Sequence, residues 1–322
     1  MAVFGSEVKK ILDALPFYVL IINKSHEILF ANKAVERELK LKPEDLIGGY
    51  CPKLVHGLDT EFEHCPLQEA VSTGSLVEKE YYDDNIQKWI KTSIYPFEHS
   101  LSGEEVAYFH IAQDITKSKQ DEEQLKASIF KLNNVTHSII EAITKTVEKR
   151  DPYTAGHQQR VSILAAGIAR KMGISEEKVE GIEIAALVHD VGKIVIPIDI
   201  LSKPGRINHH EFSLIQAHSE TGYEILQGIE FPWPVAQIVL QHHERLDGSG
   251  YPHGIKGDDI IQEARIIAVA DVVEAMSSHR PYRQALGLDK ALEEISKGKG
   301  KIYDIKVVEA CIELCKDGFF ME

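Results

Sequence analysis

Histidines and aspartates recur in the C-terminal half of this 322-residue chain, each within or beside an apolar, helix-like stretch. They are His157, His189, Asp190, His218, His242, His243 and Asp271. An ionised aspartate flanked by Leu, Val and Ala is costly to bury unless it is paired or bound to a metal. One His-Asp pair is commonly structural, but seven such positions, two of them adjacent histidines, are hard to assign to structure alone. We therefore predict that these seven side chains are metal ligands.

The number and kind of these ligands indicate a particular chemistry. Seven ligands exceed what one six-coordinate ion accepts, and a carboxylate can bridge two ions, so we expect two metals with Asp190 between them. Mixed imidazole and carboxylate ligation favours Fe or Mn, with Zn, Ni and Co as alternatives, over Mg or Ca. Two such ions can hold a hydroxide and neutralise phosphate oxygens in an in-line displacement. The predicted reaction is phosphoester hydrolysis.

Two further features lie next to these ligands in the sequence. Lys193 follows the His189-Asp190 pair by about one helical turn, so it can face the same site and offer a positive charge to a phosphate. The stretch HHERLDGSGYP, residues 242–252, continues from the adjacent histidines into a glycine-rich loop. Its glycines, Gly248 and Gly250, permit close backbone approach, and Pro252 stiffens the exit. We expect Tyr251 to be presented at the wall of the pocket.

The elements that must position these residues are helices. From about residue 135 to 322 helical patterning dominates, and apart from the short IVIPIDIL there is no strand signal. We place Gly173 and Gly192 at helix C-termini. This half is predicted to be an all-α bundle.

A long helical pattern without Pro or Gly covers residues 118–150. Its apolar residues step by four and three in alternation, which predicts a heptad seam of Leu125, Ile129, Leu132, Thr136, Ile139 and Ile143. A parallel coiled coil in a homodimer is one interpretation, and an amphipathic helix packed on its own domain is the other. We define residues 118–134 as a helical linker, with the coil continuing to about 147.

Residues 1–117 mix helical and strand periods. A hairpin around residues 23–26, short helices and then three β-rich runs ending in AQDIT resemble a PAS sensor domain, an α+β fold with an antiparallel sheet. The resemblance implies a small-molecule ligand or a dimer contact and leaves the ligand unknown. One cluster there is a candidate cofactor site for Zn, an Fe-S cluster or haem, although its spacing fits no standard finger: Cys51, His56, His64 and Cys65. The alternative is a loop with two buried thiols.

The motifs of the helical half resemble a known family as well. HDVGK at residues 189–193 with HHERLDGSGYP, preceded by RDPYTAGH and accompanied by LSKPGRI and HRPYR, is similar to the HD-GYP family of the HD phosphohydrolase superfamily. The resemblance covers residues 135–322. It implies a bacterial phosphodiesterase that hydrolyses cyclic di-GMP to linear pGpG, with a further step to GMP left open.

The resemblance also implies residue roles. It implies that the seven residues named above are metal ligands and leaves open which ion each one binds. It also implies that His189, Asp190 and Lys193 are catalytic. The substrate-contact set is Lys193, Gly250, Tyr251, Pro252, Arg280, Tyr282 and Arg283. For the two arginines and Tyr282 the alternative is salt bridges on a helix end. Some members hold a third metal through a glutamate four residues before the first histidine, but here that position is Tyr153, so we expect two metals and pGpG as the main product.

Several alternatives remain open. The same chemistry could act on 3′,3′-cGAMP or another nucleotide, or the helical half could be a non-catalytic scaffold that binds messenger or partner proteins, for which the 248–252 loop is a contact. The PAS domain is expected to regulate the helical half through the linker. His209 and His210 are interpreted as solvated surface. The net charge of −14 argues against nucleic-acid and anionic-membrane binding, and no long apolar run or signal peptide is found, so we expect a cytoplasmic protein with reduced cysteines.

Overall fold

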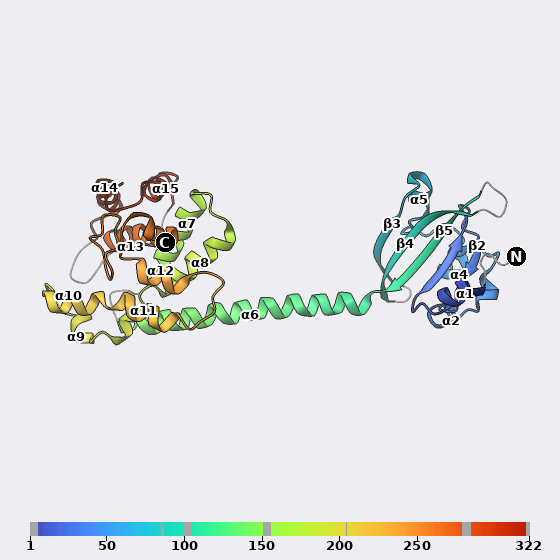
Figure 1. The fold of residues 1–322 in the computed structure, drawn as a ribbon, viewed down its shortest axis with the longest axis horizontal. Helices are drawn as coiled ribbons and strands as arrows, with labels where there is room; N and C mark the ends of the chain where they lie inside the picture. The colour runs from blue at the N-terminus through green and yellow to red at the C-terminus, as the bar shows by residue number, and fades with distance from the viewer. Residues whose placement is uncertain are drawn as a thin grey trace. The chain divides into compact units, whose positions relative to one another are not determined.

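The computed structural model describes the backbone of residues 6–84, 87–99, 105–150, 156–203, 205–278 and 285–319 (Figure 1). The chain divides into two compact units, residues 1–131 and 132–322. Each unit has a hydrophobic core of its own. No helix in these ranges is long and apolar enough to cross a membrane.

The first unit is built on a five-stranded antiparallel sheet in the order β2-β1-β5-β4-β3. The strands are β1 (Tyr18–Ile22), β2 (Ile28–Ala31), β3 (Val77–Asp83), β4 (Lys88–His99) and β5 (Glu105–Asp114). The hairpin and the three later strands of the sequence prediction are confirmed. β1 is buried along its whole length because Tyr18, Leu20 and Ile22 face the main core, while Ile21 faces a smaller cluster beside α1 (Ser6–Asp13).

Short helices cover the main core face of this sheet. They are α2 (Val35–Glu38), α3 (Pro43–Leu46), α4 (Cys51–His56) and α5 (Leu67–Thr73). Each is too short to be stable alone, so buried side chains such as Leu46 and Leu67 hold it in place. The α4 helix was not among the sequence predictions, in which this segment was a candidate cofactor site or a loop with two buried thiols. In the structure Pro52 lies in the first turn and Gly57, at φ 70°, ends the helix.

A single helix, α6 (Thr116–Glu148), follows the sheet. It begins where the Thr116 N–H donates to the Asp114 carboxylate, 3.0 Å away, and the Trp89 N–H donates to Oγ1 of Thr116. Most of α6 is exposed, including Leu132 and Ile139 of the predicted seam, but Ile140, Thr144 and Val147 are buried in the second unit. The long-helix prediction is confirmed.

Helices and 3-10 turns make up the described part of the second unit. They are α7 (His157–Lys171), α8 (Glu176–Val188), η1 (Val191–Val195), α9 (Ile198–Leu201), α10 (His209–Gln216), α11 (His218–Leu226), α12 (Val235–Gln241), η2 (Gly257–Asp259), α13 (Gln262–Ser277), α14 (Leu288–Gly298) and α15 (Ile305–Lys316). The α13 helix is apolar on nearly all sides because it packs against α7, α12, α14 and α15. The all-α prediction is confirmed, and IVIPIDIL forms a turn and α9 rather than a strand.

The two predicted helix-ending glycines have different roles. Gly173 adopts φ 75° just after α7, as expected of a glycine beyond a helix C-terminus. The prediction for Gly192 is wrong, because this residue lies inside η1. A Cβ there would lie 1.9 Å from the backbone oxygen of His218 and 2.6 Å from the backbone nitrogen of Gly222. Gly192 therefore allows η1 to touch the first turns of α11.

Candidate metal centre

The helices of the second unit bring the seven predicted ligands together. His157 and His218 are the first residues of α7 and α11, and His189 and His242 directly follow α8 and α12. Asp271 alone lies in the middle of a helix, α13. Ligands at helix ends can converge from several directions, while the apolar bodies of the helices pack behind them. The spatial convergence expected from the sequence is present.

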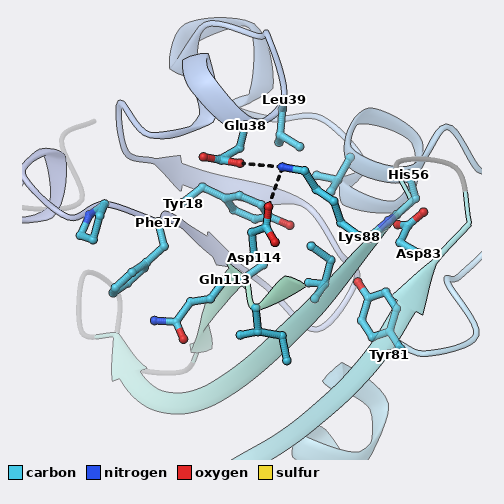
Figure 2. Close-up of a pocket in the computed structure, with 15 residues that line it drawn as sticks. Phe17, Tyr18, Glu38, Leu39, His56, Tyr81, Asp83, Lys88, Gln113 and Asp114 are labelled. Carbon is cyan, nitrogen blue, oxygen red and sulfur yellow. Dashed lines mark ion pairs between the residues drawn. The ribbon is translucent and has the colours of Figure 1, made fainter. Parts of the chain in front are cut away.

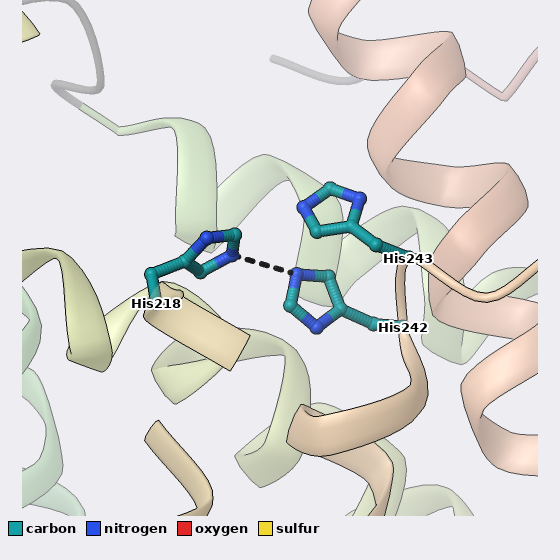
Figure 3. A group of neighbouring side chains, drawn as sticks. All are labelled: His218, His242 and His243. Carbon is teal, nitrogen blue, oxygen red and sulfur yellow. Dashed lines mark hydrogen bonds between the residues drawn. The ribbon is translucent and has the colours of Figure 1, made fainter. Parts of the chain in front are cut away.

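The possible ligand atoms form three overlapping groups. Within each group these atoms all lie within 4.8 Å of one another. The groups are His157, His189 and Asp271; His189, Asp190 and His242; and His218, His242 and His243. Figure 3 shows the last group, in which the Nε2 atoms of His218 and His242 are 3.3 Å apart. All seven predicted residues belong to at least one group. Two groups share His189 and two share His242, so the seven residues form one connected cluster.

Backbone carbonyls orient three of the histidines in the same way. Nδ1 of His189, His218 and His242 lies 2.6 Å from the carbonyl oxygen of the residue three positions earlier. A ring that donates from Nδ1 has its lone pair on Nε2, the atom that faces the cluster. This is the tautomer that metal binding requires, so the donor set fits a metal centre.

His157 is oriented differently. Its Nδ1 contacts the carboxylate of Glu274, and its Nε2 lies 3.2 Å from Oδ1 of Asp271. Glu274 is almost fully buried, and it also accepts hydrogen bonds from Nε of Arg160 and from the Ser278 hydroxyl. The sequence prediction missed Glu274. Its position one turn after Asp271, in the apolar run AVADVVEAM, was the available signal.

Asp190 lies between two of the groups. Its Oδ2 is 3.5 Å from Nε2 of His189 and its Oδ1 is 3.6 Å from Nε2 of His218. The Lys193 ammonium, from η1, is 2.7 Å from Oδ2. Two oxygens directed at two different imidazoles are the arrangement that a bridging carboxylate needs. Lys193 faces the same site, as its spacing predicted.

Electrostatics keep the carboxylates of the cluster ionised. Burial alone would raise the pKa of Asp190, but Lys193 and the neighbouring imidazoles outweigh it and hold this pKa well below its usual range. The pKa of Asp271 is also lowered despite burial, chiefly by the hydrogen bond with His157. These are the charge states in which aspartates bind cations.

The histidines differ from one another in charge. Burial lowers the pKa of His218 to about 4, and burial together with neighbouring imidazoles lowers that of His242 and His243. For His157 burial also favours the neutral form, but hydrogen bonds with Asp271 and Glu274 prevail and raise its pKa to about 9. His218, His242 and His243 are thus neutral and can donate a lone pair to a metal. Asp271 and Glu274 stabilise positive charge at His157.

Comparison with known proteins agrees with this geometry. Residues 141–307 match the family described as HD domain, which is more than half of the chain. The chain belongs to the HD domain family. Residues 16–117 match the family described as PAS domain, so both resemblances noted in the sequence are confirmed.

Characterised relatives of the HD domain include three phosphodiesterases. The chain is 40% identical over 193 residues to the cyclic di-GMP phosphodiesterase response regulator RpfG of Xanthomonas campestris, covering 59% of this chain and 51% of that protein. It is 43% identical over 181 residues to a cyclic di-GMP phosphodiesterase of Thermotoga maritima, covering 56% and 49%. It is 42% identical over 154 residues to 3′3′-cGAMP-specific phosphodiesterase 3 of Vibrio cholerae, covering 48% and 34%. The chain thus spans about half or less of each relative's length.

The glycine-rich loop of the HD domain covers one side of the cluster. A Cβ on Gly250 would lie 2.5 Å from backbone atoms of His243, Glu244 and Arg245, so the loop can fold this closely onto the segment after His242 only with glycine there. The ring of Tyr251 consequently lies against that of His243, with the ring centroids 4.6 Å apart and the planes tilted by 33°, and its edge is toward His218. The expected presentation of Tyr251 at the site is observed, and Pro252 follows in a cis peptide.

Other residues predicted in the sequence lie elsewhere. Arg280, Tyr282, Arg283 and Tyr153 fall outside the described residues. His209 and His210 are exposed at the start of α10, as expected.

The candidate cofactor cluster of the PAS domain is dispersed. Cys65 Sγ lies 3.9 Å from Nε2 of His26, His56 stacks on Phe62, and His64 stacks on Tyr81. Cys51 is buried at the start of α4. Among the described residues these four side chains do not form a group of three converging ligand atoms.

Proposed function

We propose that this protein is a metal-dependent phosphodiesterase that hydrolyses cyclic di-GMP to linear pGpG. The observation that carries the proposal is the buried cluster of five imidazoles and two carboxylates, in which three rings direct Nε2 inward from backbone-fixed positions. The two relatives named as cyclic di-GMP phosphodiesterases support the substrate.

The chain's own residues define what the site would do. The seven ligands would hold two divalent transition ions, Fe or Mn in the first instance, which when bound would supply Lewis acidity for activating water and neutralising phosphate charge. Lys193 would bind a non-bridging phosphate oxygen, since its ammonium already faces the cluster through Asp190. Tyr251, fixed against His243, would form one wall of the substrate pocket and limit access of bulk water.

The substrate contacts and product are further parts of the proposal. Gly250, Tyr251 and Pro252 form a loop that a nucleotide or a partner protein would contact, and Arg280, Tyr282 and Arg283 are proposed to bind phosphate or guanine edges. With Tyr153 where a third-metal glutamate would stand, pGpG is the expected main product.

A second candidate substrate is 3′,3′-cGAMP. The 42% identity to a Vibrio cholerae phosphodiesterase named as specific for that molecule favours it, and the metal centre would use the same chemistry on either messenger.

The test is turnover of the full chain with Mn or Fe(II) on cyclic di-GMP and on 3′,3′-cGAMP, with products identified by mass spectrometry. We expect cyclic di-GMP to be cleaved to pGpG. His189→Ala and Asp190→Ala should lose metal and turnover while remaining folded, and His210→Ala is a matched control because His210 is exposed on α10. Full turnover by metal-free protein would refute the proposal, and tight binding of the messenger without turnover would favour a scaffold.

We also propose a homodimer through the exposed apolar seam of α6, with the PAS domain regulating hydrolysis. Leu125, Ile129 and Leu132 are more than half exposed in the single chain, and their spacing matches a parallel coiled coil. Leu132→Lys should shift the protein to monomer in sedimentation, whereas Lys131→Ala, at the neighbouring exposed position, should not. Monomeric wild-type protein at micromolar concentration would contradict the dimer. The predicted cytoplasmic location stays a prediction.

A further inference from the structure

The PAS domain contains a cavity of about 440 Å³ between the sheet and the helices α2 and α4 (Figure 2). This volume lies within the range of small-molecule sites. Its lining includes the apolar side chains of Phe17, Leu39 and Val55 and the phenol rings of Tyr18 and Tyr81. None of the lining residues belongs to the metal centre.

Two phenol hydroxyls belong to the lining of this cavity. Tyr18 and Tyr81 are each 8% exposed, yet among the described residues neither hydroxyl makes a hydrogen bond. Neither hydroxyl is among the fully buried unpartnered atoms of the described residues, so both are open to a ligand or water in the cavity that can donate to or accept from a phenol.

The charge of the lining is negative. Three carboxylates, Glu38, Asp83 and Asp114, face the cavity with one ammonium, Lys88. Figure 2 shows Lys88 engaged with two of them, 2.6 Å from Asp114 and 3.9 Å from Glu38. His56 adds no positive charge at neutral pH, since burial lowers its pKa.

The pKa of the Tyr18 phenol reflects the same negative charge. Burial raises the pKa of Tyr18, and Tyr81, Cys51, Asp83 and Glu38 raise it further. An anionic ligand would therefore meet repulsion in addition to the cost of losing its hydration. A cation would be attracted by the carboxylates of the lining.

We propose that this cavity binds a small organic cation, an amine with an aromatic or aliphatic body. The amine would lie toward Asp83 and the phenol oxygens, and the body would lie against Phe17, Leu39 and Val55. The proposal does not depend on the hydrolase activity or on the metals.

A ligand in this cavity would lie next to the start of α6. Asp114 and Ile115, which line the cavity, immediately precede the helix, and the Asp114 carboxylate accepts from the Thr116 N–H at its start. Occupation of the cavity would therefore act on the first turn of α6.

The experiment is calorimetric titration of the full chain with three probes that share a phenol body: tyramine, which is cationic, tyrosol, which is neutral, and 4-hydroxyphenylacetate, which is anionic. We expect tyramine to bind at least ~10-fold more tightly than tyrosol, because a charge-assisted hydrogen bond exceeds a neutral one by about this factor, and we expect no binding of the anion. The affinity should be the same with and without EDTA, which separates the cavity from the metal centre. Phenethylamine, tryptamine and benzyltrimethylammonium test bodies of other sizes.

Matched variants locate the binding. Asp83→Asn and, independently, Tyr18→Phe should weaken tyramine at least ~5-fold while each variant remains folded by circular dichroism, since each removes one polar group of the cavity. Asp45→Asn removes an exposed carboxylate of the same domain outside the cavity and should have no effect. The proposal is overturned if none of the four cations binds at millimolar concentration, if tyrosol binds as tightly as tyramine, or if both cavity variants bind like the wild type.

Discussion

Glu274 offers a direct test of how the cluster is organised. The variant Glu274→Gln keeps the size of the side chain but removes the negative charge that contacts Nδ1 of His157, Arg160 and Ser278. The other oriented histidines have carbonyl partners, so His157 alone would lose an ionic one. Loss of a group that orients a metal ligand typically weakens metal binding by about 10–100-fold, or ~1.4–2.8 kcal/mol.

The effect should be confined to one of two ions. His157 belongs only to the group with His189 and Asp271. The group containing Asp190 and the group containing His218 do not include it. We therefore expect a chelator titration followed by metal analysis to show one Mn or Fe(II) weakened by this factor and the other within about threefold of wild type.

Two controls complete this experiment. Glu180→Gln removes an exposed carboxylate on α8 and should leave both ions unchanged. Glu274→Asp keeps the charge and should recover part of the affinity. If Glu274→Gln is folded by circular dichroism and binds both ions as wild type does, the carboxylate does not orient His157 for metal binding and the reasoning is wrong.

Three other perturbations have defined outcomes. Gly192→Ala places a methyl group against the backbone of His218, so urea unfolding should show a free energy of unfolding lower by ~1–3 kcal/mol, together with reduced metal content. Gly228→Ala, with open space around it, should be tolerated. Equal stability of the two variants would contradict the close approach of Gly192 to His218. His110 is buried with its Nδ1 unpartnered, and burial lowers its pKa to about 3. Because the unfolded chain binds a proton below pH 6.5 and the folded chain does not, stability should fall as pH decreases through the window from 6.5 to 3, by ~2–3 kcal/mol between pH 7.5 and 4.5. The loss should be smaller in His110→Gln, measured by Trp89 fluorescence in a Trp233→Phe background, and equal losses would exclude His110 as the cause. Thr144→Val removes the hydrogen bond to the carbonyl of Leu187 and should lower stability by ~1 kcal/mol, detectable as an earlier urea midpoint, while Thr146→Val, whose hydroxyl bonds only within α6, should change it less.

The sequence was sufficient to predict the residues whose chemistry is unusual for their surroundings. Asp190 and Asp271 stood out because a carboxylate in an apolar helix needs a partner, and all seven predicted ligands converge in the structure. The long helix and the strands were predictable from periodicity, which depends only on near neighbours in the chain. These features are local, and local patterns are what a sequence displays.

Features that depend on pairing between distant segments were not predictable in the same way. Gly192 was placed at a helix end because nothing in its neighbourhood reveals the contact with His218. Glu274 resembles an ordinary helical acid until α7 places His157 beside it. The PAS cavity is lined from six separate segments of the chain, and so its shape and negative charge became visible only in the fold.

The hydrogen bond between Thr144 of α6 and the carbonyl of Leu187 joins the last turns of that helix to a residue two positions before His189. Thermodynamic linkage makes this connection run in both directions. If a displacement of α6 changes the affinity of the cluster for its ions, then loading those ions changes the equilibrium of α6 by the same free energy. The metal supply of the cell would then act on this protein as an input in its own right, alongside any ligand of the PAS domain.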